Sequence, residues 1–133
     1  MPRALAVTFR IIDWSMLAYW SVALLACLGM LKLPASSMYA GYGTALIDAW
    51  NWSFAPIDVA FAATGLGSVV LARRGDARWM GLAIISATLT FCAGAMAIAF
   101  WAIAGEFDLA WWLPNLLLSA VGLYWAGRLT QRN

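Results

Sequence analysis

An aspartate placed just inside an apolar segment, Asp58, is the residue whose type and position best suit chemistry. It follows Pro56 by two positions, and Trp52 precedes both. Burying an ionised carboxylate at the centre of a membrane helix costs about 2.5–3.5 kcal/mol on insertion scales, so we expect this side chain to face the interior of a helix bundle. Its carboxyl group is then protonated, hydrogen-bonded to Asn51 or Asn115, or bound to a cation.

A structural role for Asp58 is the alternative. With Pro56 in the first helical position, Asp58 falls in the first turn, where an acidic side chain complements the helix dipole and accepts hydrogen bonds from free amides. The two roles are compatible, and the sequence leaves both open.

A second stretch nearly repeats the first, because Trp111, Trp112, Pro114 and Asn115 open another apolar run. The amide of Asn115 offers both a donor and an acceptor, which is typical of a hydrogen-bond partner between helices. Each proline opens a helix at the same end of the predicted bundle, and polar groups in hydrocarbon need partners. We therefore expect Asp58 and Asn115 to lie within hydrogen-bonding reach, directly or through one water.

Further candidates for a ligand site lie near these two residues at the same predicted end. Glu106 and Asp108 lie in a turn, where the ordinary alternative is that they are simply solvated. No catalytic residue and no metal ligand can be assigned. The predicted ligand-binding set is Asp58, Asn115, Trp52, Trp101, Trp111, Trp112, Glu106, Asp108 and Asn51.

One more acid, Asp13, follows Arg10 by three residues. Because Arg10 precedes the predicted first membrane span, Asp13 is expected at the cytoplasmic edge in an interfacial ion pair with Arg10. In that position it cannot cooperate with Asp58, which belongs to the opposite end of the membrane.

Composition excludes several classes of protein. Of the 133 residues, 65% are hydrophobic and 11% are charged, whereas a soluble domain carries about a quarter charged residues. Lipid must therefore be the solvent for most of the chain. The lack of histidine excludes imidazole metal sites and Ser-His pairs. A net charge of +2 argues against nucleic acid as a partner. Cys27 and Cys92 lack CxxC spacing, so no cofactor is predicted.

Four apolar runs are long enough to cross a bilayer at about 1.5 Å per residue. The sequence predicts an all-α integral membrane four-helix bundle, formed by a single domain over residues 1–133. A short helix at the membrane interface is predicted within the loop 33–52, over residues 44–52. The predicted spans cover residues 11–31, 53–72, 79–102 and 111–128.

Small residues at helical spacing indicate where the helices pack, because lipid supplies no hydrophobic drive for helix association. The two halves of the chain also resemble each other, which suggests a parallel two-plus-two repeat. The alternative is that Trp and Pro independently favour interfaces and first turns. The predicted packing positions are Ala60, Thr64 and Ser68, then Ser86, Thr90 and Gly94, then Asn115, Ser119 and Gly122.

The most specific segments of the chain are Trp-Asn-Trp-Ser-Phe at residues 50–54 and Phe-Asp-Leu-Ala-Trp-Trp at residues 107–112. Shorter ones are Asp-Trp at 13–14, Thr-Gly-Leu at 64–66 and Leu-Thr-Phe-Cys at 89–92. Together these segments resemble the YvaD-like family of small bacterial membrane proteins. The resemblance implies four membrane-spanning helices and a bacterial plasma membrane. It implies no catalytic residues.

Three functions of different classes follow from these patterns. The favoured one is a protein that binds or transports a cationic or amphipathic small molecule at Asp58 and the surrounding tryptophans. The second is a structural or accessory membrane subunit without a ligand. The third is a membrane enzyme in which Asp58 is the general acid for an apolar, isoprenoid-like substrate. The expected partners are the lipid bilayer and a second copy of the chain, because a homodimer would enclose the site.

Both termini are predicted to be cytoplasmic. Of the eight Lys and Arg residues, all but Lys32 fall in the terminal segments or in the turn at residues 73–78. The positive-inside rule places that side in the cytoplasm. In a cysteine-free background, Ala77→Cys should react with a membrane-impermeant thiol reagent only after cells are opened. Labelling of Ala77→Cys in intact cells would show the opposite orientation.

Overall fold

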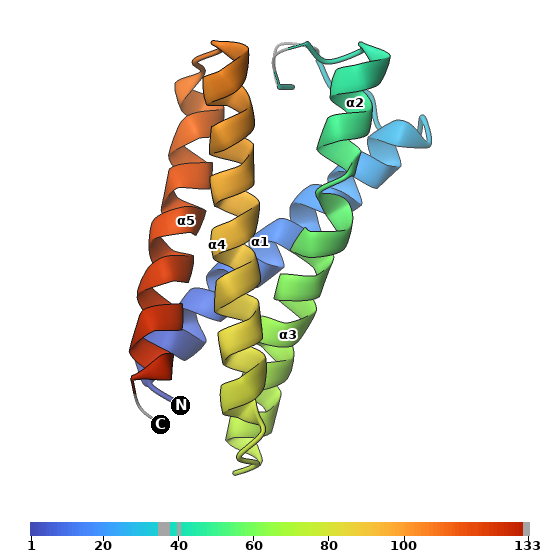
Figure 1. The fold of residues 1–133 in the computed structure, drawn as a ribbon. Helices are drawn as coiled ribbons and strands as arrows, with labels where there is room; N and C mark the ends of the chain where they lie inside the picture. Colours follow the sequence, from blue (N-terminus) through green and yellow to red (C-terminus); the bar gives the residue numbers. More distant parts are fainter. Residues whose placement is uncertain (35–37, 40, 132–133) are drawn as a thin grey trace.

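The computed structural model describes residues 1–34, 38–39 and 41–131, and its regular elements are all helices (Figure 1). Four apolar stretches are long enough to cross a membrane, and the second of them combines α2 and α3. The predicted all-α architecture with four candidate membrane-spanning segments is therefore confirmed. The helices are α1 (Arg3–Cys27), α2 (Ala45–Trp52), α3 (Ala55–Arg73), α4 (Trp79–Ala104) and α5 (Leu109–Thr130).

Helix α1 begins and ends earlier than the predicted span 11–31. Its first turns are held by packing, since Leu5 and Phe9 are buried in a cluster with Leu129 of α5. Its end is set by Gly29, whose φ of 71° is the left-handed conformation that commonly terminates helices. The amide of Gly29 donates to the carbonyl of Ala26 at 3.0 Å.

Helix α2 lies where the sequence predicts a short helix, but it continues the course of α3 (Figure 1). Ser53 and Phe54, which join the two helices, both have right-handed helical φ and ψ angles. Asp58 therefore lies within an almost continuous helix, and its amide donates to the carbonyl of Phe54 at 3.0 Å. Asp58 lies in the first turn of α3 after Pro56, as predicted, but its carboxylate accepts from a tryptophan of α1 and from no first-turn amide among the described residues.

Helices α4 and α5 pack at close range through glycines. A methyl group on Gly122 would collide with the backbone of Phe91, and one on Gly94 would lie 2.5 Å from the carbonyl oxygen of Asn115 and 2.7 Å from the hydroxyl of Ser119. The predicted face of Asn115, Ser119 and Gly122 is therefore the packing face of α5. Such close backbone approach is the usual substitute for a hydrophobic drive in membranes.

Helices α3 and α4 meet along the predicted stripes of small residues. Ser86 Oγ donates to the carbonyl of Phe61 at 2.9 Å, and Phe61 packs in a buried cluster with Ala62 and Ala93. Helix α1 packs on α3 and crosses the bundle obliquely (Figure 1). It starts near the C-terminal end of α5 and diverges from α5 toward α2.

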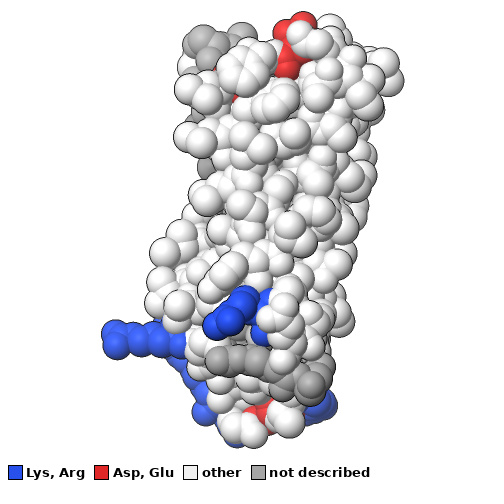
Figure 2. All heavy atoms as spheres, turned by 60° about the vertical axis from the view of Figure 1, so that its left-hand side comes forward, with Lys and Arg blue, Asp and Glu red and all other residues white. Residues whose placement is uncertain are grey.

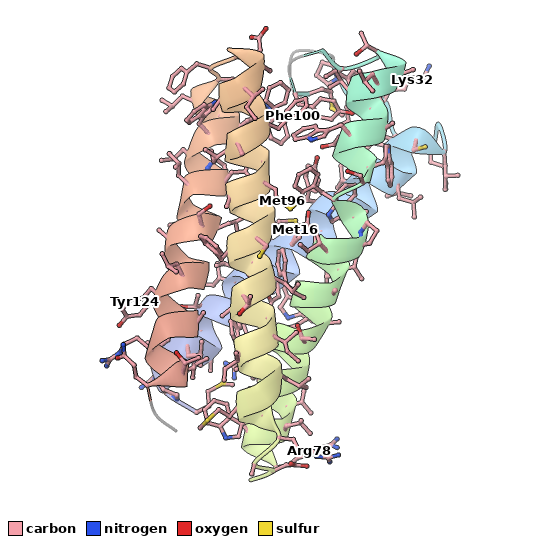
Figure 3. The ribbon with its side chains drawn as sticks, in the orientation of Figure 1. Met16, Lys32, Arg78, Met96, Phe100 and Tyr124 are labelled. Carbon is pink, nitrogen blue, oxygen red and sulfur yellow. The ribbon has the colours of Figure 1, made fainter. Side chains whose placement is uncertain are left out.

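The two ends of the molecule differ in chemistry. Figure 2 shows Lys and Arg side chains toward the end that holds the termini, and an uncharged band above them. We call this the Arg-rich end. At its α3–α4 turn, Arg78 pairs with Asp76 at 2.6 Å, and hydrogen bonds from Arg78 lower the pKa of Asp76 to about 2. The opposite end, formed by α2 and the α4–α5 turn, is the Trp-rich end, and Lys32 lies there (Figure 3).

The glycine contact between α4 and α5 makes a direct prediction. Gly122→Ala should destabilise the bundle by about 1–3 kcal/mol, because the new methyl group meets backbone atoms that cannot rotate away. Gly127→Ala on the same helix is the matched control: nothing lies within 4 Å of the added carbon, and alanine favours helix. Thermal unfolding in mild detergent should show a lower midpoint for Gly122→Ala alone. Equal midpoints for the two variants would contradict the close packing.

Candidate functional site

A cavity of about 400 Å³ lies between the helices toward the Trp-rich end. It forms because α1 stays on α3 and α5 stays on α4, while α1 and α5 diverge. Its wall is formed by α1, the loop before α2 at Tyr39, α2 itself, α3 with the preceding Phe54, α4 and α5. Figure 3 shows Met16 and Phe100 pointing toward this region from α1 and α4. The aromatic residues of the wall are Tyr19, Trp20, Tyr39, Trp50, Phe54, Trp101 and Trp111.

Asp58 is the one charged side chain among the described residues that line the cavity. The residue is only 6% exposed, and its Oδ2 accepts a hydrogen bond of 2.9 Å from Trp20 Nε1. The Trp20 ring is in turn held by Trp52, whose ring centroid lies 5.3 Å away. The sequence therefore identified the central polar group, and the structure supplies its partner from α1.

Asn115 also lines the cavity, but it does not hydrogen-bond Asp58. Its Nδ2 donates to the carbonyl of Trp111 at 2.8 Å, one turn earlier in α5. The predicted direct pairing of Asp58 with Asn115 is thus wrong. The reason is that each side chain has another partner, and the cavity that both of them line lies between α3 and α5.

The other predicted site residues divide into two groups. Asn51, Trp101 and Trp111 line the cavity, and Asn51 Oδ1 accepts from Tyr19 Oη at 3.4 Å. Trp52 supports Trp20 and is not part of the wall.

The remaining three predicted residues lie at the α4–α5 turn, away from the cavity wall. Glu106 is exposed, and its carbonyl accepts a hydrogen bond from Trp112 Nε1 at 3.2 Å. Asp108 is also exposed and caps α5 by accepting from the amide of Ala110 at 2.9 Å. These residues therefore order the turn.

Sequence reasoning missed the residues that α1 and the loop contribute. Tyr19 and Trp20 form an aromatic pair inside an apolar span, which could have marked them as candidates. Nothing in the sequence, however, indicated that their side chains face the interior of the bundle. Tyr39 is 5% exposed and donates to Asp48 Oδ1 at 2.8 Å. Burial and this hydrogen bond raise the pKa of Tyr39. Trp50 stacks on Phe100 with ring centroids 3.9 Å apart, which closes the Trp-rich end of the site.

Asp13 is not at the edge of the bundle and makes no ion pair with Arg10. It is fully buried, and neither carboxyl oxygen has a hydrogen-bond partner among the described residues. The prediction failed because α1 begins at Arg3, which places Asp13 about 15 Å along the helix axis. No group of three His, Cys, Asp or Glu that could hold a metal ion occurs within the described part of the chain.

The pairing of Asp58 with Trp20 generates a stability prediction. Asp58→Leu should cost about 1–3 kcal/mol because it leaves a buried indole N–H without an acceptor. Asp58→Asn keeps an acceptor oxygen and should unfold near the wild-type temperature. In a Trp20→Phe background the two variants should differ little, since the donor is gone. Thermal unfolding of this set in mild detergent checks the pair. An equal loss for Asp58→Asn and Asp58→Leu would show that the hydrogen bond contributes nothing.

Comparison with known proteins places the chain in a family. The family model described as a family of unknown function (DUF5360) matches residues 5–133. The uncharacterized protein YvaD of Bacillus subtilis (strain 168) is 37% identical over 113 residues, which are 85% of this chain and 81% of YvaD. No solved structure matches the chain. The four candidate membrane helices and these two matches confirm the resemblance found in the sequence, and the chain belongs to the YvaD-like family of unknown function, DUF5360.

Proposed function

We propose that this protein is a small multipass protein of the bacterial plasma membrane that binds a cationic, amphipathic small molecule in the cavity at Asp58, as a carrier or receptor for it. The observation that supports this function is a buried carboxylate in an aromatic cavity of about 400 Å³. That volume is within the usual range for small-molecule sites, which combine apolar walls with a few placed polar groups.

The charge and the aromatic rings both favour a cation. Asp58 is the one charged group among the described lining residues, so an anionic ligand would meet only repulsion. Trp20 occupies Oδ2, while Oδ1 makes no hydrogen bond within the described residues. The rings of Trp101 and Trp111 can add cation–π attraction, which is strongest where water is excluded.

The position of the rim favours an amphipathic molecule that enters from the lipid. Ile11 of α1, 62% exposed, and Leu117 of α5 lie on the two diverging helices and also line the cavity. In the proposed orientation the Arg-rich end is cytoplasmic. The opening lies between two candidate membrane-spanning helices, so it faces the hydrocarbon of the bilayer. A second copy of the chain, forming the proposed homodimer, would enclose the opening.

A pair of isosteric probes tests the proposal. Benzyltrimethylammonium carries a positive charge beside a phenyl ring, and neopentylbenzene has the same shape without the charge. Isothermal titration into protein in lipid nanodiscs should detect the cation and give much weaker binding of the neutral compound. Asp58→Asn should weaken cation binding about tenfold or more, a loss of about 1.4 kcal/mol.

Glu106→Gln is the matched control, because it removes one exposed acid that does not line the cavity. It should bind the cation as the wild type does. Equal binding of the two probes, or an unchanged affinity in Asp58→Asn, would contradict the proposal. No binding of either probe would favour a structural subunit in its place.

A further inference from the structure

A second buried carboxylate, Asp13, lies outside the proposed ligand site. It does not line the cavity, it is 0% exposed, and both of its oxygens lack a partner in the described residues. It lies against α3 and α4 where Gly65 provides room: a methyl group on Gly65 would overlap Asp13 Oδ2 and lie 2.7 Å from Ser86 Oγ. Because Gly65 has no side chain, it leaves the space that the carboxyl group of Asp13 occupies.

Asp13 belongs to a regular pattern on the α1–α3 interface. Trp20 lies seven residues after Asp13 on α1, and Asp58 lies seven residues before Gly65 on α3. The two helices are antiparallel, so they meet through two polar contacts about two turns apart, Asp13 at Gly65 and Trp20 at Asp58. The second contact is satisfied by a hydrogen bond, and the first contains the unpaired carboxyl group.

No described cation is placed to neutralise Asp13. Helix α4 carries no charged residue, and its one titratable group is the thiol of Cys92. On α3 the ionisable groups are Asp58, which is bound to Trp20, and the exposed Arg73 at the far end. The half-buried Arg10 on α1 forms no ion pair with Asp13.

The remaining ionisable groups also lie elsewhere. On α1 these are Arg3 at its first turn, Tyr19, whose hydroxyl donates to Asn51, and the exposed Cys27. On α5, Tyr124 and Arg128 are exposed.

The surroundings suit a proton better than a metal ion. Asp13 lines neither of the two described cavities, and it packs directly against Gly65. Ser86 Oγ uses its single hydrogen in the bond to the carbonyl of Phe61. That hydrogen is therefore not available to a carboxylate at Asp13, whereas a protonated carboxyl group carries no charge that needs a partner.

We propose that Asp13 is a proton-binding site within the membrane, and that its bound proton keeps α1 docked on α3. Loss of the proton places an unpaired charge between α1 and α3, where its burial is costly, and so favours separation of the two helices. This inference needs no ligand and is independent of the proposed cation binding.

Infrared spectroscopy of the protein in lipid tests the proton directly, because a protonated carboxyl group has a C=O stretching band that a carboxylate lacks. At neutral pH this band should be present in wild type and in Asp58→Asn, and should be lost or clearly reduced in Asp13→Asn. A spectrum of Asp13→Asn identical to wild type overturns the proposal. A wild-type spectrum without the band at neutral pH also overturns it, even if Asp13→Asn fails to fold.

Hydrogen–deuterium exchange tests the link to docking. After correction for the intrinsic pH dependence of exchange, peptides from residues 3–27 should exchange faster in wild type as pH rises. Asp13→Asn, which is always neutral, should lose this extra dependence, whereas Asp58→Asn should keep it. The same pH dependence in wild type and Asp13→Asn would refute the role of the proton in holding α1.

Discussion

The docking of α1 on α3 through buried polar groups is the constraint on which the rest of the structure depends. An apolar helix gains little free energy when it exchanges contacts with lipid for contacts with another helix. The direction and register of helix packing must therefore come from polar groups, which need a partner in hydrocarbon. The bond between Trp20 and Asp58 supplies such a group near the Trp-rich end. The fit of Asp13 against Gly65 supplies another two turns away. Together they fix α1 along α3, while the ring of Tyr19 on α1 reaches Trp111 of α5 with ring centroids 6.4 Å apart.

The cavity follows from this arrangement. Helices α4 and α5 are joined by contacts of Gly94 and Gly122 that allow little separation, so α5 cannot move across to α1. At the Arg-rich end, Leu5, Phe9 and Leu129 close the bundle. At the Trp-rich end the same helices diverge, and large rings such as Trp50 and Phe100 cover the space without filling it. A short bundle with few residues in its interior can therefore still enclose a cavity of about 400 Å³.

Much of this could be predicted from the sequence, because hydropathy and small-residue spacing act along one helix at a time. Those signals predicted the four spans, the α4–α5 face at Gly122 and the burial of Asp58. The rotation of one helix against another depends on pairs of side chains far apart in the chain. The sequence therefore did not reveal that Trp20, and not Asn115, pairs with Asp58. Asp13 was misplaced because local charge at Arg10 outweighed the packing of Leu5 and Phe9, which extends α1 to Arg3.

The two buried acids differ in a way that separates their chemistry. Asp58 borders open space, has one oxygen fixed by an indole and is surrounded by aromatic faces, so a molecule can reach it. Asp13 lies outside that cavity and packs against Gly65, with neither oxygen hydrogen-bonded within the described residues, so a proton is the ligand proposed for it. Both depend on α1, which carries Asp13 itself and also Trp20, the partner of Asp58. Asp13 and Trp20 lie seven residues apart, which is about two helical turns. A movement of α1 away from α3 would therefore alter both groups together, and this shared helix is the physical basis on which occupancy of the cavity and protonation can be linked.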